Sequence, residues 1–193
     1  TRAPRELEYY RLPFGPMAVA DEVGLHVIHE LVLEGLEAGE VVEWSVRAPD
    51  GAETSGSFQA GAALTSGFRF AWLADTSFPM ASDTVAVLAA QSPQVTLHGG
   101  DITYQPNPLD SWNLAMQSFA PLFRVAPMHF VVGNHEFEML DEITEQFDRL
   151  FAGQGEGDPR GRFHAFTFGG IRFLSLDTES GALESMDEPQ LAW

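Results

Sequence analysis

The sequence predicts a layered α/β domain over residues 68–193, preceded by a partial antiparallel β-sandwich over residues 1–67. From residue 68 onward, short apolar runs alternate with segments of helical periodicity, a pattern typical of a sheet with helices packed on it. Before residue 68, strand patterns follow one another with only turn residues between them, which is typical of antiparallel sheets. We therefore expect two structural units with different architectures.

The composition is that of a folded protein with a strongly acidic surface. Hydrophobic residues make up 45% of the 193 residues and charged residues 20%, which is enough for a sizeable core. The formal net charge is −18, and all ten basic residues are arginine. Such a charge disfavours nucleic acid and anionic membranes as partners. A phosphate-binding site would need a local positive charge, and a bound metal ion is the simplest source.

The sequence lacks cysteine and any apolar run of membrane-spanning length, which excludes some kinds of site and segment. The sequence has no cysteine, which excludes disulfides and thiolate metal sites. Its apolar runs are of strand length, so none is expected to span a bilayer. The chain does not begin with Met, and we expect a processed or excised start.

The first unit contains strands predicted over residues 24–33, 41–47 and 57–60. The middle strand has the clearest pattern, because Val42, Trp44 and Val46 occupy every second position and define one apolar face. These strands are too few for a sandwich, which needs about seven. We therefore expect its first strands to lie upstream of Thr1.

The second unit begins with alternating strands and helices. We predict strands over residues 68–74, 95–98 and 127–132, with helices over 82–90 and from 110 or 111 to about 121. Ser82 should cap the first helix. In the second helix, Trp112, Met116 and Phe119 should face the core, because they fall on one side of the helix.

A further helix and a hairpin follow the third strand. Apolar residues on one helical face predict a helix over residues 140–151, which Gly153 should end. Residues 163–168 and 171–176 should form a hairpin about Gly169-Gly170, a typical two-residue turn. Residues 189–193 resemble the start of another helix.

Each of the three predicted parallel strands ends in a residue that can bind a metal ion through oxygen. Asp75 follows the first strand, Asp101 the second, and Gly133-Asn134-His135-Glu136 the third. Ligands bind at the carboxyl ends of strands in open α/β sheets, so we expect these side chains to lie close together. Their oxygens suit hard metal ions, and a pair of such ions can hold both the attacking and the leaving oxygen of a phosphoryl transfer. His135 would be free to contact substrate.

These segments resemble the first three motifs of the calcineurin-like metallophosphoesterases. They are Phe-Ala-Trp-Leu-Ala-Asp at 70–75, Gly-Asp-Ile-Thr-Tyr at 100–104, and Gly-Asn-His-Glu at 133–136. Tyr104 further resembles the purple acid phosphatase branch, in which a tyrosinate binds ferric iron. The preceding β-sandwich fits that branch, since residues 33–39 and the strand after them resemble the central hairpin of a fibronectin type III-like module. Residues 68–193 would then be the N-terminal half of a layered metallophosphatase β-sandwich flanked by helices.

The resemblance implies hydrolysis of phosphate monoesters by a binuclear metal centre, as in acid phosphatases. Asp75 and Tyr104 would bind a ferric ion. Asp101 would bridge it to a divalent ion (Fe, Zn or Mn), which Asn134 would also bind. A metal-bound hydroxide would attack phosphorus, while His135 orients the phosphate and helps to protonate the leaving group. The expected partner is a small phosphorylated substrate, and the expected localisation is secreted or periplasmic.

Two features depart from the family pattern. Ser77 stands where many members have a histidine, which agrees with the branch in which a tyrosine supplies the missing ligand. The later family motifs, a lone His and Gly-His-x-His, do not occur in the sequence up to Trp193, so the chain carries about half of the site. We expect the remaining ligands to come from downstream sequence or from another chain. This chain alone should bind metal poorly and be inactive.

Other assignments stay open at this point. The protein could be a phosphodiesterase of the same superfamily, or a catalytically incomplete fragment that acts as a structural or binding module through its β-sandwich. Asp75 and Asp101 could be turn carboxylates, and Tyr104 a packed loop aromatic. Glu136 is expected to support a neighbouring side chain or amide rather than to bind metal. His98 is expected to be a hydrogen-bonded core histidine.

Overall fold

The computed structural model describes most of the chain, with several short gaps. The described residues are 5–9, 24–28, 33–48, 51–62, 67–77, 81–102, 104, 108–138, 141–179 and 189–193. Within these ranges, no helix is both long enough and apolar enough to cross a membrane.

A three-stranded parallel sheet forms the centre of the α/β part. Its strands, in order across the sheet, are β5 (Phe70–Leu73), β6 (Val95–His98) and β7 (Met128–Phe130). Leu73, His98 and Phe130 are aligned across the three strands, so the carboxyl ends of all three lie at one edge of the sheet. Val95 and Thr96 are fully buried, as expected of a central strand that is covered on both faces.

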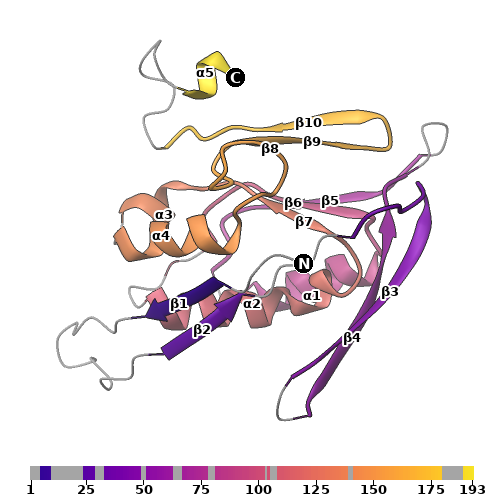
Figure 1. Cartoon of the computed structure of the whole chain (residues 1–193), viewed down its shortest axis with the longest axis horizontal. Helices are drawn as coiled ribbons and strands as arrows, with labels where there is room; N and C mark the ends of the chain where they lie inside the picture. The colour runs from indigo at the N-terminus through magenta and orange to yellow at the C-terminus, as the bar shows by residue number, and fades with distance from the viewer. Residues whose placement is uncertain are drawn as a thin grey trace.

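Helices cover one face of this sheet, and a second sheet covers the other (Figure 1). Helices α1 (Ser82–Ala90) and α2 (Pro108–Phe123) form the crossovers between the parallel strands. The second sheet is antiparallel and contains β8 (Glu156–Gly157), β9 (His164–Phe168) and β10 (Ile171–Ser175). Phe68, Phe166, Phe168 and Phe173 pack around Val95 between the two sheets. The central strand β6 is therefore covered on both faces, whereas Phe70 and Trp72 of the edge strand β5 remain 52% and 68% exposed.

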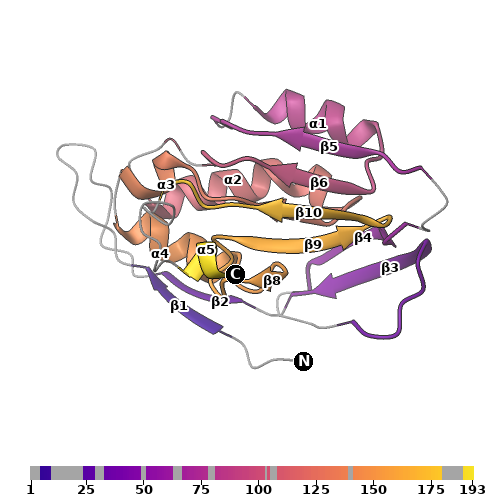
Figure 2. The same ribbon diagram turned by 90° about the horizontal axis from the view of Figure 1, so that it is seen from above.

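Helices α3 (Asn134–Glu138) and α4 (Asp141–Leu150) lie toward the carboxyl edge of the parallel sheet (Figure 2). The last described element is α5 (Pro189–Ala192). As predicted, β9 and β10 form a hairpin, and both Gly169 and Gly170 have positive φ, at 56° and 77°. Leu140, in the predicted helix 140–151, lies outside the described residues.

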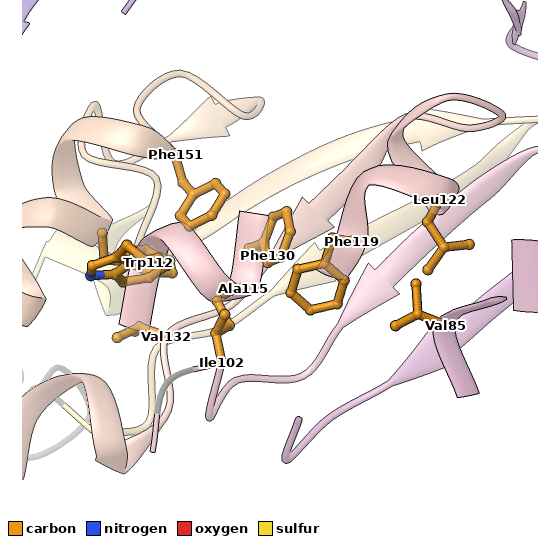
Figure 3. Close-up of a cluster of buried hydrophobic side chains, with 10 residues drawn as sticks. Val85, Ile102, Trp112, Ala115, Phe119, Leu122, Phe130, Val132 and Phe151 are labelled. Atoms are coloured by element: carbon orange, nitrogen blue, oxygen red, sulfur yellow. The ribbon is translucent and has the colours of Figure 1, made fainter. Parts of the chain in front are cut away.

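The main hydrophobic core lies between the parallel sheet and helices α1, α2 and α4 (Figure 3). Trp112 and Phe119 of α2, Phe130 of β7 and Phe147 of α4 are all almost completely buried. The rings of Phe119 and Phe130 meet edge to face, with centroids 5.7 Å apart. Aromatic contacts of this kind contribute beyond the area that they bury. They fix the position of β7 and hence of the turn that follows it.

The N-terminal strands form two separate hairpins. β1 (Arg5–Tyr9) pairs with β2 (Gly24–Ile28), and β3 (Glu40–Arg47) pairs with β4 (Glu53–Ala60), both antiparallel. The strand β1 was not predicted, and β2 ends at Ile28, with residues 29–32 of the predicted strand outside the described ranges. The partial fibronectin type III-like sandwich and the boundary between residues 67 and 68 stay predictions.

Several local predictions are wrong. Residue Ser82 does not cap α1, because the N-cap is Ala81 and no side chain bonds there, while the Ser82 hydroxyl donates to Ser118 Oγ at 3.5 Å. Helix α2 begins at Pro108 rather than at 110 or 111, which is consistent with the preference for proline in the first turn. The strand predicted over 127–132 is only three residues long, and a helix, α3, follows it.

Candidate metal centre

The turns that follow β5 and β6 carry the two carboxylates. Asp75 comes two residues after β5, and Asp101 comes three residues after β6. Both have left-handed backbone conformations, with φ of 54° at Asp75 and 56° at Asp101. Such a conformation costs a non-glycine residue roughly 1–3 kcal/mol and persists only where the surrounding structure enforces it. It is frequent at functional sites.

Backbone contacts join these two turns to each other and to the third. The Asp75 N–H donates to the Gly100 carbonyl at 3.1 Å, and the Thr76 N–H donates to the Asp101 carbonyl at 2.9 Å. Gly100 has a φ of 97°, and a Cβ at this position would lie 2.8 Å from the Cα of Gly133. Only glycine permits so close an approach at that φ. The three turns after the parallel strands are therefore in direct contact.

The Tyr104 hydroxyl joins the two carboxylates. It lies 3.0 Å from Asp75 Oδ1 and 3.3 Å from Asp101 Oδ2. Burial raises the pKa of the Tyr104 hydroxyl, and hydrogen bonding to the two carboxylates and their negative charge raise it further. The hydroxyl is therefore protonated here and acts as a donor. Two acidic side chains and one phenol oxygen thus converge on a single point.

Asn134 and His135 begin helix α3 beside these groups. The His135 N–H donates to Asp101 Oδ1 at 3.0 Å, which ties the start of the helix to the second turn. The His135 ring lies against the Tyr104 ring, with centroids 4.2 Å apart. Its Nδ1 is buried and has no hydrogen-bond partner among the described residues. Contacts thus join Asp75, Asp101, Tyr104 and His135, and Asn134 lies next to His135 in the chain.

The donor set is rich in oxygen. In the part of the chain that the structure describes, no three His, Cys, Asp or Glu side chains are placed to hold a metal ion. The candidate ligands are instead two carboxylates, a phenol and an amide, from Asp75, Asp101, Tyr104 and Asn134. Hard cations prefer oxygen ligands of these kinds. The residues present therefore fit a hard metal ion.

A comparison with known families agrees with this geometry. The family model for calcineurin-like phosphoesterases matches residues 68–188, which include all three strand-end turns. The chain belongs to this family. Calcineurin-like phosphoesterases hydrolyse phosphoesters, and the family generally binds divalent metals. Neither the curated proteins nor the solved structures contain a match to the chain.

A buried histidine supports the first two turns of this phosphoesterase. His98 is fully buried at the end of β6. Its Nδ1 accepts the Gly100 N–H at 3.2 Å, which leaves Nε2 to carry the proton and donate to Thr76 Oγ1 at 2.9 Å. Burial lowers the pKa of His98 to about 3, so the ring is neutral. The prediction of a hydrogen-bonded core histidine is confirmed.

Sequence reasoning missed Thr76 and described Glu136 only in general terms. The Thr76 side chain lies in the first turn and is 4% exposed, and its hydroxyl bonds His98. The Glu136 carboxylate is fully buried and accepts backbone N–H groups from the second and third turns. Thr76 follows Asp75 directly, and its position as a polar residue next to a predicted ligand could have identified it as part of the site.

Two further histidines lie away from this site, between the two sheets. The His129 ring stacks on Phe166 with centroids 3.5 Å apart, and His164 is fully buried. Burial lowers the pKa of both, to about 3 for His129. Two surface hollows, of about 670 and 600 Å³, lie beside β4 and include none of the candidate ligands. We assign the chemistry to the strand-end site because convergent polar groups are found there.

Proposed function

We propose that this phosphoesterase hydrolyses phosphate monoesters at a binuclear centre of one ferric and one divalent ion (Fe, Zn or Mn), as acid phosphatases of the purple type do. The observation that supports the ferric ion is the position of the Tyr104 hydroxyl, within hydrogen-bond distance of both Asp75 and Asp101. A phenol in that position can replace its proton with a metal ion. Ser77, in place of a histidine ligand, is consistent with this choice.

The four oxygen donors divide between the two ions. Asp75 and Tyr104 would hold the ferric ion, Asp101 would bridge the ions, and Asn134 would hold the divalent one. When bound, the ions supply Lewis acidity, which stabilises charge on the phosphoryl oxygens and lowers the pKa of water. Four side chains fill only part of two coordination shells. We therefore propose that the remaining ligands come from outside the described residues.

His135 is proposed to act on the substrate itself. Its backbone is held by Asp101 and its ring by Tyr104, so the imidazole has a fixed position beside the proposed metal ligands. From there it can donate a hydrogen bond to a phosphate oxygen and pass a proton to the departing alkoxide. In a chain with a net charge of −18, a donor at this point also offsets repulsion of the phosphate.

Hydrolysis of two chromogenic esters tests the proposal. The protein, supplied with Fe(III) and Zn(II) and with the proposed remaining ligands present, should hydrolyse 4-nitrophenyl phosphate faster than bis(4-nitrophenyl) phosphate. His135→Ala should lower kcat by about a hundredfold or more. Its metal content, measured on the same sample, should stay that of the unaltered protein. A preference for the diester would overturn the monoesterase proposal, and unchanged turnover in His135→Ala would overturn the role of His135.

A further inference from the structure

The Glu136 carboxylate makes an unusual set of contacts beside the proposed metal ligands. The side chain is fully buried, although glutamate is among the residues least often buried. Its Oε2 accepts the N–H groups of Asp101 at 3.0 Å and Gly133 at 2.9 Å, and its Oε1 accepts the N–H of Ile102 at 2.8 Å. Three backbone donors thus satisfy one carboxylate.

These donors belong to two different turns. Asp101 and Ile102 lie in the turn after β6, whereas Gly133 lies in the turn after β7. A buried N–H without a partner is costly, so both turns are stabilised by the same side chain. The bond to the Asp101 N–H also helps to hold that residue in its left-handed conformation, at a φ of 56°.

The contact between the turns is reciprocal. Glu136, from the third turn, accepts the backbone N–H of Asp101, and Asp101, from the second turn, accepts the backbone N–H of His135. On the other side of Glu136, its backbone carbonyl accepts a hydrogen bond from the Thr144 hydroxyl of α4. Through these bonds α3 is connected both to the Asp101 turn and to the helix behind it.

We infer that Glu136 is the positioning residue of the metal centre: its carboxylate holds the Asp101 turn and the Asn134–His135 turn at a fixed separation. This inference rests on the proposed function for its metal-binding consequence. We place Glu136 behind the metal ligands rather than among them, because both of its oxygens accept backbone donors and the side chain is fully buried. Residues that orient metal ligands in this way typically change affinity about tenfold to a hundredfold when altered.

The test replaces Glu136 with glutamine, which has the same shape but only one acceptor oxygen. In Glu136→Gln the side-chain amide must face at least one N–H donor, so that bond is lost. The matched control is Glu145→Gln on the exposed face of α4. Hydrogen exchange of the amides of Asp101, Ile102 and Gly133 should become about tenfold faster or more in Glu136→Gln, and stay unchanged in the control.

Metal binding provides the second measurement. The affinity of the protein for Mn²⁺, measured by titration with the proposed remaining ligands present, should fall about tenfold to a hundredfold in Glu136→Gln, with no change in Glu145→Gln. Unchanged amide exchange in a folded Glu136→Gln protein would overturn the inference. So would faster exchange with an unaltered Mn²⁺ affinity, because the turns would then be loosened without effect on the ligands.

Failure of the variant to fold and failure of the proposed function can each be told apart from failure of the inference. If Glu136→Gln does not fold, Glu136→Asp keeps the charge but shortens the reach, and equal Mn²⁺ affinity and exchange in that variant would contradict the inference. If the unaltered protein binds no Mn²⁺ even with the proposed remaining ligands present, the proposed function fails. The amide exchange would then still decide whether Glu136 holds the two turns together.

Discussion

The Tyr104 hydroxyl donates a hydrogen bond to Asp75 at 3.0 Å, although 29 residues separate the two in sequence. This bond links the turn after the first parallel strand to the loop after the second. Because the same hydroxyl lies 3.3 Å from Asp101, it occupies the point at which the two acidic turns meet. The proposed metal centre depends on this point, and so do the structural supports around it.

Alanine at Gly100 should loosen the contact between the turns. Gly100 has a φ of 97°, and a Cβ there would lie 2.8 Å from Gly133 Cα. We expect Gly100→Ala to lower the free energy of unfolding by about 2–4 kcal/mol, since backbone strain adds to a clash with another main chain. Urea denaturation measures this change.

The control for this substitution is Gly35→Ala. Gly35 has a similarly positive φ, 75°, but a Cβ there would meet nothing within 4 Å. Gly35→Ala should lower the free energy of unfolding only by the strain of the left-handed conformation, about 1–2 kcal/mol. If the two variants were destabilised equally, close approach of the Gly100 and Gly133 turns would not be what requires glycine.

The stability of the fold should decline in acid, because His98 must stay neutral. Its folded-state pKa is about 3, below the ordinary value of 6.5, so the unfolded chain binds the proton more tightly. The stability that this group contributes is fully present above about pH 6.5 and is lost as the pH falls toward 3. In that window His98 should contribute a slope of about 1.4 kcal/mol per pH unit.

Comparison with His98→Gln isolates this slope from the titration of carboxylates. Glutamine can still bond Thr76 but cannot be protonated, so the variant should be less stable at pH 8 and lose less stability on acidification. The measurement is the free energy of unfolding in urea at a series of pH values from 8 to about 4. If the free energy of unfolding fell in parallel for the two proteins, protonation of His98 would not be a cause of the loss of stability in acid.

Gln154 should stabilise the edge of β7 that faces away from β6. Its side-chain Oε1 accepts the Phe130 N–H at 2.6 Å, and its Nε2 donates to the Phe130 carbonyl at 3.0 Å, as a neighbouring strand would. Gln154→Glu removes the donor and places an acceptor against that carbonyl. We expect a loss of about 1–3 kcal/mol in the free energy of unfolding.

Gln117→Glu, on the exposed side of α2, is the control for this charge change. It should alter the free energy of unfolding by no more than about 0.5 kcal/mol. Both variants can be compared by thermal and urea denaturation. An equally small effect at Gln154 would mean that water replaces its hydrogen bonds to β7 without loss.

The sequence predicted the centre of the fold because its signals there are local. Apolar runs before Asp75 and Asp101 predict strands, and the parallel sheet places their carboxyl ends together. The run before Asp101 is buried, but Phe70 and Trp72 in the run before Asp75 are exposed, because β5 lies at the edge of the sheet. Helix α3 was missed because five residues are too few to show a helical period. The cap at Ser82 failed because that hydroxyl bonds Ser118, a residue 36 positions away.

The supporting contacts of the site could not be predicted in the same way. The three donors to Glu136 are backbone groups, which carry no residue identity, and two of them are 34 and 35 residues distant in sequence. Likewise, β1 pairs with β2 so that Arg5 lies opposite Ile28, and no sequence pattern within residues 5–9 predicts that β2 is the partner strand. Long-range pairing of this kind is decided by the folded structure.

The visible absorption spectrum of the Fe(III)-loaded protein tests the central claim most directly. If Asp75, Asp101 and Tyr104 form an iron site, charge transfer from the Tyr104 phenolate to Fe(III) should colour the protein. Tyr104→Phe, brought to the same iron content, should lack this visible charge-transfer band. A colourless iron-loaded protein, or a band that persists in Tyr104→Phe, would contradict the account.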